Sequence, residues 1–544
     1  MDKNANSDKH LPFLGLAIFG IVGWLKYKTA FIVFYNHNRY LIAALIALAV
    51  MIIYLRLKHI YLKARKSKDI EKEVLAKSEY EDSLFAGLTE QKKPVFIKES
   101  FRRMHTQVVG TTNAGKTESV ILPWAIDDMK KGRGLVIIDG KSDRSLLNKL
   151  YAYAKEFHRE DDIRILSLCS PSISHTFNPL SNGSPLEVTE RIFKSLTFDN
   201  EYYKNLQYET LLQTLLIFEA CKITPTPLRL IDALRSPRQL KHLSTLGGNE
   251  SQIEWVKSQL SLNRDEREQR TSGFITQLQV LTVGDTACIF NADSSDIDLD
   301  IALQKGHIIY CQLPVLKVPT LGKTVGKLVL QCMQGAVASR HLSTTNEHQF
   351  FSVYLDDFTE YLTDGFVSLL NKSRSANVGI VFAHQALGDL ATLGDAVKNT
   401  ILTNANLKVF MRTNEPESAE YFSATIGTVQ TAKVTERQKS GTLGSTKTGD
   451  GSVREAEAFK YHPNLFKQDL GIGEAVVILP HSKGSLPFRV KFRKSPDLDP
   501  PKIPDVLKVT PVGLPPVPED TKTKIKSSLT KNILAATSGE REVA

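Results

Sequence analysis

Cysteine is scarce in this sequence and follows no pattern. The 544 residues include 5 cysteines, none of them at CxxC spacing, and no cluster of histidines accompanies them. The spacing therefore excludes a disulfide framework and the common zinc-binding arrangements. We expect reduced and mostly buried thiols, as is usual in a cytoplasmic domain.

The sequence also lacks motifs of a separate RNA- or DNA-binding fold, although the chain is basic. Its formal net charge is +10 and its isoelectric point is about 9.1. A basic balance of this size favours polyanion partners, either nucleic acid or anionic lipid. With 42% hydrophobic and 24% charged residues the composition is that of a globular protein, and the length suits two to four domains.

The N-terminal region lacks a signal-peptide cleavage site but contains two apolar runs. The first covers Leu11–Leu25 and the second Tyr40–Leu55, and no small-residue cleavage site precedes Asn36. A spanning helix needs about 20 apolar residues, so we predict that residues 1–68 form a two-helix transmembrane anchor. Lysines and arginines cluster between Arg56 and Lys68, which places the main body on the cytoplasmic side.

From about residue 94 onward, short apolar runs alternate with helical stretches. Near-continuous apolar runs are typical of strands that are covered on both faces of a parallel sheet. The predicted strands are Thr106–Val109, Gly134–Ile138, Ile163–Leu166, His307–Gln312, Phe350–Leu355, Val378–Phe382, Leu407–Met411 and Ala475–Leu479. The alternation predicts an α/β domain.

The alternation stops between about residues 185 and 297, where the sequence has helical spacing and no clear strand. We interpret this stretch as an all-α domain inserted into the sheet domain, because a separate second domain would leave residues 69–184 with too few strands for a core. The sheet domain then comprises residues 69–184 and 298–495.

Three later segments lack the pattern of helices and strands. Gln438–Val453 is rich in Gly, Ser, Thr and Lys, which predicts a flexible loop. Pro496–Pro518 is proline-rich and has no aromatic residue, which predicts an extended linker. Residues 496–544 are therefore expected to form a proline-rich disordered tail. Its polar end, Glu519–Ala544, either binds a partner by folding on contact or only solubilises the protein.

One motif carries the strongest chemical signal, a phosphate-binding loop that fits GxxxxGK[ST]. Its glycines let the backbone wrap a phosphate, Lys116 would reach the β- and γ-phosphates of ATP, and the Thr117 hydroxyl would bind Mg²⁺. A predicted strand leads into the loop and a helical stretch follows it. The loop residues are Gly110, Thr111, Thr112, Asn113, Ala114, Gly115, Lys116 and Thr117.

Two acidic residues follow the predicted strand Phe350–Leu355. We assign Asp356 to Mg²⁺ and Asp357 to polarising the attacking water, since a P-loop domain needs both roles filled. An acidic helix N-cap is the alternative interpretation. Asp139 also follows a predicted strand and should lie at the same edge of the sheet, where ligands bind.

Polar and basic residues flank the next two predicted strands. His384 and Gln385 follow Val378–Phe382, and a polar side chain there can sense the γ-phosphate. Arg374 precedes the same strand and is our candidate for an arginine that acts on a neighbouring subunit, with Arg412 as the second candidate. An ordinary surface arginine remains an equal alternative for either residue.

The order of these features resembles the type IV coupling proteins of bacterial conjugation and secretion, the TraD/TraG family. The resemblance covers about residues 10–490. After the anchor and the P-loop, it is carried by Asp139-Gly140-Lys141-Ser142-Asp143, Phe177-Asn178-Pro179-Leu180, the helical stretch, Asp356-Asp357-Phe358 and Ala383-His384-Gln385.

The resemblance implies a RecA-like P-loop domain with an inserted, cargo-facing all-α domain and a two-helix membrane anchor. Such a protein binds ATP and Mg²⁺, assembles as a homo-hexamer beneath the bacterial inner membrane, and sits in the lipid bilayer as a multi-pass protein. It couples the relaxase and other relaxosome proteins to a type IV secretion channel and pumps single-stranded DNA. By position, Arg374 matches the arginine finger of the family and Gln385 its glutamine motif.

One residue departs from the family pattern. The family usually has Asp-Glu where this chain has Asp356-Asp357, and the shorter side chain would lie about 1 Å further from the water, so we expect slow hydrolysis or assistance by Glu360. Two other functions stay open, and the departure at Asp357 favours the second of them. The chain could be a coupling receptor for protein effectors, which its short tail after Pro496 disfavours, or a docking receptor with weak ATPase activity.

Overall fold

The computed structural model describes most of the chain and divides it into two compact units, Met1–Lys77 and Ser78–Ala544. The described residues are 27–28, 37–38, 40–41, 43–62, 65, 82–198, 200–344, 348–363, 365–391, 394–441, 444–481 and 484–517.

The first unit contains the second of the two predicted membrane helices. Helix Ala43–Leu62 has 20 residues, a mean hydropathy of 1.9 and no buried share, so its length and composition suit a membrane span. It is the one such helix among the described residues. The first predicted run, Leu11–Leu25, lies outside them, so the described residues show one candidate span and the two-helix anchor stays a prediction.

The second unit is built on an 11-stranded sheet with the order β2-β1-β13-β12-β9-β3-β8-β7-β4-β6-β5. Its strands are β1 (Ser83–Thr89), β2 (Pro94–Lys98), β3 (Thr106–Val109), β4 (Gly134–Asp139), β5 (Ile163–Ser167), β6 (Ile308–Gln312), β7 (Phe351–Asp356), β8 (Val378–His384), β9 (Leu407–Phe410), β12 (Glu474–His481) and β13 (Gly484–Phe492).

All eight strands predicted from the apolar runs are present. The strands from β9 to β5 in the sheet order pair in parallel, as predicted. Strands β1, β2 and β13 were not predicted, and together with β12 they form an antiparallel extension at one edge.

Strand β4 illustrates why the central strands are apolar on both faces. Leu135 and Ile137 point into a core with helices α3 (Leu122–Lys130) and α4 (Arg144–Glu156). Val136 and Ile138 point into the opposite core with α14 (Pro319–Leu342) and α15 (Gly365–Ser373). Successive side chains of a strand face opposite ways, so covering both faces requires an unbroken apolar run.

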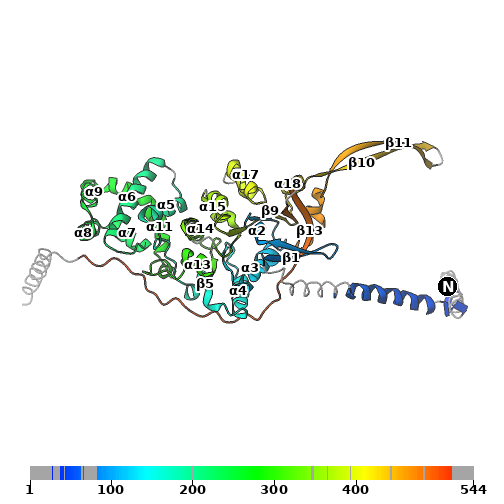
Figure 1. Cartoon of the computed structure of the whole chain (residues 1–544), viewed down its shortest axis with the longest axis horizontal. Helices are drawn as coiled ribbons and strands as arrows, with labels where there is room; N and C mark the ends of the chain where they lie inside the picture. The colour runs from blue at the N-terminus through cyan, green and yellow to red at the C-terminus, as the bar shows by residue number, and fades with distance from the viewer. Residues whose placement is uncertain are drawn as a thin grey trace, which may run out of the picture. The chain divides into compact units, whose positions relative to one another are not determined.

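Between β5 and β6 the described residues form helices and short helical turns but no strand. The helices are α5 (Pro185–Ser195), α6 (Glu201–Ala220), α7 (Pro227–Arg235), α8 (Pro237–Gly247), α9 (Glu250–Ser261), α10 (Arg264–Gln269), α11 (Ser272–Leu278), α12 (Ala287–Phe290) and α13 (Leu299–Lys305). Figure 1 shows α5 to α11 gathered together at one end of this unit. The apolar faces of these helices, with the exception of α10, share one continuous core with β4, β6 and α14.

The prediction of a flexible loop at Gln438–Val453 is wrong. This stretch belongs to a hairpin of β10 (Thr428–Gly441) and β11 (Gly444–Phe459), which forms a separate antiparallel two-stranded sheet after α18 (Pro416–Ile426) (Figure 1). A hairpin is held together by backbone hydrogen bonds between its two strands, and these form with polar as well as apolar side chains. A composition rich in Ser, Thr and Lys therefore does not exclude a hairpin.

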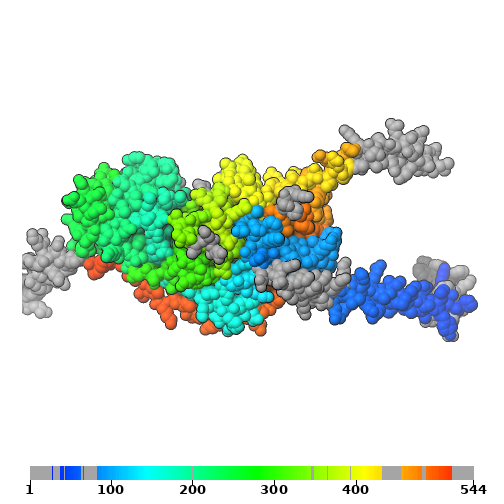
Figure 2. Space-filling model, viewed as in Figure 1, coloured from blue at the N-terminus to red at the C-terminus, as the bar shows by residue number. Residues whose placement is uncertain are grey.

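The proline-rich segment is extended, as predicted, but its described part, residues 496–517, packs along the body and is not the disordered tail expected from composition. Figure 2 shows this orange-red segment lying against the surface of the second unit. The amides of Val506 and Leu507 donate to Ser172 O at 2.9 and 3.1 Å, and the Gln239 side chain donates to Pro515 O at 2.9 Å. The segment therefore contacts both the sheet domain and the helical region. The tail beyond residue 517 lies outside the described residues.

Candidate functional site

The P-loop connects β3 to a π-helical turn, Thr117–Ile121, that continues into α3. Asn113 and Gly115 adopt positive φ angles of 65° and 97°, which lets the loop curl back over the helix start. A Cβ on Gly115 would also lie 3.1 Å from the amide nitrogen of Gly473, in the turn before β12. The loop thus has the geometry that directs amide groups toward a phosphate at a helix N-terminus.

The two sequence motifs assigned to nucleotide binding meet in space. Thr117 Oγ1 donates a hydrogen bond to Asp356 Oδ2 at 2.7 Å, and Asp356 is almost fully buried. Lys116 Nζ donates to Gly110 O at 2.6 Å and to Thr111 O at 3.4 Å. Burial lowers the pKa of Lys116, and the nearby Lys141 lowers it further.

Strand register brings Asp356 to this place. In the parallel pairing of β4 with β7, Asp139 lies opposite Asp356. Asp139 itself organises the turn after β4, because its carboxylate accepts hydrogen bonds from the amides of Lys141 and Asp143 and from Tyr310 Oη at 2.8, 2.6 and 2.7 Å. Burial raises the pKa of Asp139, and these hydrogen bonds oppose that rise. Its observed contacts are those of a turn-forming residue.

Asp357 follows in a left-handed conformation with φ 48° and a partly exposed side chain. Lys141 Nζ lies 3.3 Å from Asp357 Oδ2 and 3.4 Å from Asp356 Oδ2. Burial raises the pKa of Asp357, and Lys141 opposes this effect. Burial also acts to lower the pKa of Lys141, but the two carboxylates outweigh it and the net effect is a rise. Lys141 was not predicted to belong to the site, and the one signal for it in the sequence is its place in the motif after β4.

Gln385 lies beside the P-loop, as the sequence analysis required. Thr112 Oγ1 donates to Gln385 Oε1 at 3.1 Å, so the end of β8 touches the loop directly. The backbone amide of Gln385 donates to Asp389 Oδ2 at 2.9 Å, and this hydrogen bond fixes the turn after β8.

His384 is buried beneath this edge in a defined tautomer. Its Nδ1 lies 2.8 Å from Ala386 O and its Nε2 lies 3.0 Å from the amide nitrogen of the Gln107 side chain. The Gln107 oxygen accepts from Lys408 Nζ at 3.1 Å, so the Gln107 nitrogen is a donor and His384 is neutral with its proton on Nδ1. Burial lowers the pKa of His384 to about 4 and that of Lys408 to about 8.

Arg374 is not brought to the P-loop of its own chain. It is exposed in the turn between α15 and β8, at the opposite edge of the sheet. Strand β8 has 7 residues, which places the two edges about 20 Å apart.

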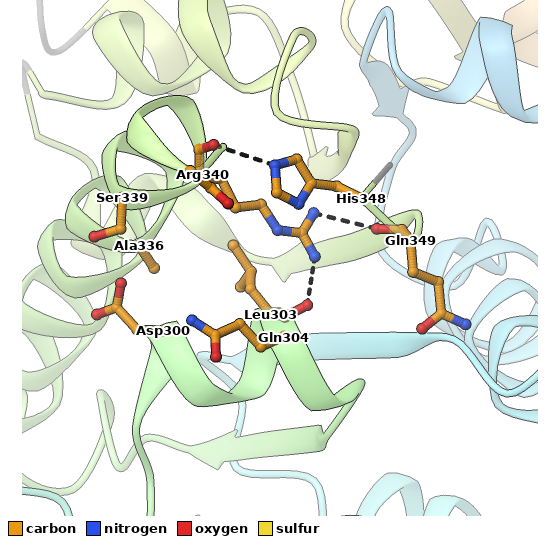
Figure 3. A pocket seen from close by; sticks show the side chains of 9 residues that line it. Asp300, Leu303, Gln304, Ala336, Ser339, Arg340, His348 and Gln349 are labelled. Atoms are coloured by element: carbon orange, nitrogen blue, oxygen red, sulfur yellow. Dashed lines mark hydrogen bonds between the residues drawn. The ribbon is translucent and has the colours of Figure 1, made fainter. Parts of the chain in front are cut away.

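Arg340 supports the turn that carries Arg374. Figure 3 shows its guanidinium donating to the carbonyls of Leu303 and Gln349. All three residues line a cavity of about 450 Å³. Arg340 also donates to Ala376 O, in the Arg374 turn, at 2.9 Å.

The other two residues considered from the sequence lie nearer the P-loop. Arg412 follows β9, and its carbonyl accepts from the amide of Thr111 at 2.8 Å. Glu360 lies beyond Asp357 and pairs with Lys323 of α14 at 3.0 Å.

The residues present fit a magnesium nucleotide. Among the described residues, no group of three or more His, Cys, Asp and Glu side chains could hold a metal. Mg²⁺ that is shared with phosphates needs only one or two carboxylates and a hydroxyl, and Thr117 with Asp356 supplies such oxygen ligands at 2.7 Å from one another.

Comparisons with known proteins identify a matching family and a relative. Residues 351–459 match the family described as the TraM recognition site of TraD and TraG. The type 4 coupling protein DotL of Legionella pneumophila is 21% identical over 411 residues, which cover 61% of this chain and 50% of DotL. The chain thus spans about half the length of this curated relative.

Solved structures share the fold. The unbound bacterial conjugative coupling protein TrwB has a TM-score of 0.56 and 14% identity, with 77% of this chain and 91% of that chain covered. TrwB in complex with ADP and Mg²⁺ has a TM-score of 0.53 and 14% identity, with 76% and 91% covered. The matched segment, the relative and the shared fold confirm the resemblance indicated by the motifs: this chain is similar to the type IV coupling proteins of the TraD/TraG family.

Proposed function

We propose that the chain is a membrane-anchored ATPase that couples a relaxosome to a type IV secretion channel and moves single-stranded DNA. The observation that carries this proposal is the 2.7 Å hydrogen bond between Thr117 and Asp356, which joins the P-loop to the carboxylate strand in one sheet. That arrangement serves ATP hydrolysis with Mg²⁺.

Each residue of the site has a distinct role in this proposal. The amides of the P-loop and Lys116 hold the phosphates, and Thr117 with Asp356 holds Mg²⁺. The bound metal would neutralise charge that develops on the transferred phosphate. Asp357 polarises the attacking water, and Gln385 reports the state of the site through Thr112.

The assembly follows from the position of Arg374. An arginine at the edge opposite its own P-loop can complete the site of a neighbour, so the proposal includes a homo-hexameric ring. Residues 1–68 would anchor the ring in the inner membrane as a two-helix hairpin, with the body in the cytoplasm. Helices α5 to α12, within residues 185–297, would form the cargo-facing domain.

Two further observations support DNA as the cargo. TrwB, which shares the fold, is a conjugative coupling protein. The net charge of +10 suits a phosphate backbone, which translocation contacts without reading bases. DotL is a type 4 coupling protein, a description that does not specify DNA, so protein cargo is the second candidate.

ATP turnover of the full-length protein in detergent, with and without single-stranded DNA, tests the proposal. Lys116→Ala serves as the inactive control. Turnover that rises with DNA and is lost in the variant supports a DNA motor. Turnover that DNA does not change favours protein cargo, and no turnover above Lys116→Ala favours a docking receptor.

A further inference from the structure

The turn after β4 holds Lys141 in a fixed backbone position. Asp139 accepts hydrogen bonds from the amides of Lys141 and Asp143 at 2.8 and 2.6 Å. The hydroxyl of Ser142, a residue with φ 63°, donates to Leu313 O, and Gln312 donates to Ser142 O at 3.1 Å. The turn is thus tied to the ends of both β4 and β6, and the Lys141 side chain starts from a rigid base.

From this base the Lys141 ammonium lies against both carboxylates of the site. Its Nζ is 3.5 and 3.4 Å from the two oxygens of Asp356 and 3.3 Å from Asp357 Oδ2. The Asp356 side chain is 1% exposed and that of Asp357 is 18% exposed, so water does little to relieve the repulsion between these neighbouring carboxylates. Lys141 supplies the compensating positive charge.

The same place is where the proposed function needs Mg²⁺. A divalent ion bound by Asp356 would stand close to the ammonium, and two cations at a distance of about 4 Å repel each other strongly outside bulk water. Lys141 is 41% exposed and has a flexible four-carbon stem, so it can swing into solvent when the metal enters.

We propose that Lys141 is the resident counter-ion of the Asp356–Asp357 pair, which Mg²⁺ displaces when it binds with nucleotide. Lys141 acts as a positioning residue: it keeps the two carboxylates together in the nucleotide-free protein and sets the Mg²⁺ concentration at which the site fills. This inference rests on the proposed nucleotide site and adds a competition that neither the motifs nor the relatives describe.

The first test measures ADP binding to the full-length protein in detergent as a function of Mg²⁺ concentration. Lys141→Met should lower the Mg²⁺ concentration needed for half-maximal binding by about tenfold, because a competing cation is removed. Lys141→Arg should stay close to the wild type. Lys149→Met is the matched control, since Lys149 also bridges two carboxylates, Glu118 at 3.0 Å and Asp497 at 3.2 Å, but outside the site.

An unchanged or higher Mg²⁺ requirement in Lys141→Met would overturn the inference. Failure of the wild type to bind ADP at any Mg²⁺ concentration would instead refute the proposed function. In that case thermal unfolding without nucleotide still decides the inference. Lys141→Met should lower the Tm, and adding Asp357→Asn should restore most of the loss because the uncompensated charge is removed. Additive effects of the two substitutions would refute the counter-ion role.

Discussion

Strand β8 is held by two buried neutral histidines, and acidification should therefore destabilise the fold. Near the start of β8, His105 Nδ1 accepts from the Ile380 amide at 3.2 Å and Nε2 donates to Leu370 O at 2.7 Å. At the end of the strand, His384 donates to Ala386 O at 2.8 Å. Protonation would place a second hydrogen where each imidazole now accepts one, so both contacts require the neutral form.

The size of the effect follows from the pKa values. Burial lowers the pKa of His105 and of His384 from 6.5 to about 4. Unfolding returns the pKa of each histidine to its ordinary value of 6.5, so between pH 4 and pH 6.5 the unfolded chain binds more protons than the folded chain. Each histidine thus contributes stability that is fully present above pH 6.5 and is lost as the pH falls to 4. The loss is about 3 kcal/mol for each, because a tenfold change in a proton equilibrium is worth about 1.4 kcal/mol.

Urea unfolding of the full-length protein in detergent between pH 7.5 and about pH 4.5 measures this loss. The free energy of unfolding should fall by up to about 2.7 kcal/mol per pH unit from these two groups together. The double variant His105→Gln/His384→Gln keeps a hydrogen-bond donor but does not titrate, so it should be less stable at neutral pH and less sensitive to acid. His462→Gln, on an exposed histidine, is the control. An acid response in the double variant equal to that of the wild type would refute the reasoning.

Three further predictions concern the site, the turn that carries Arg374 and the C-terminal segment. Asp357→Glu should raise the rate of single-turnover ATP hydrolysis about tenfold, because the longer side chain brings its carboxylate nearer the attacking water. An unchanged rate would mean that the backbone already brings the shorter aspartate side chain close enough to this water. Arg340→Met should lower the free energy of urea unfolding by about 3 kcal/mol, since three carbonyls lose a charged donor; a loss below about 1 kcal/mol would contradict that role. Ile503 has a side chain with 5% exposure, so Ile503→Asp should detach the proline-rich segment from the body and create new cleavage sites near residue 503 in limited proteolysis. An unchanged cleavage pattern would show that the hydrogen bonds of the segment hold it in place without Ile503.

The sequence predicts the central strands well and the edge strands poorly, for a physical reason. Strands such as β4 and β8 are buried on both faces, so they require continuous apolar runs that are visible without a structure. Strand β13 in the antiparallel extension carries Pro487 and Arg489 among its apolar residues, and besides β12 it pairs with β1, which lies far away in the sequence. The hairpin β10–β11 carries no apolar run at all, and only its backbone pairing defines it.

In the candidate site, too, local features could be predicted from the sequence and contacts between distant residues could not. The P-loop is a local motif, so its residues and their order could be assigned from the sequence. Lys141 and Asp356 lie 215 positions apart, and what joins them is the register in which Asp139 of β4 pairs with Asp356 of β7. A slip of that register by one residue would turn the apolar side chains of β7 to the wrong faces and would move the carboxylates away from Thr117 and Lys141. The apolar side chains of β7 pack into the two cores on either side of the sheet, and this packing fixes the register of the strand. The same packing therefore determines which charged groups meet in the site.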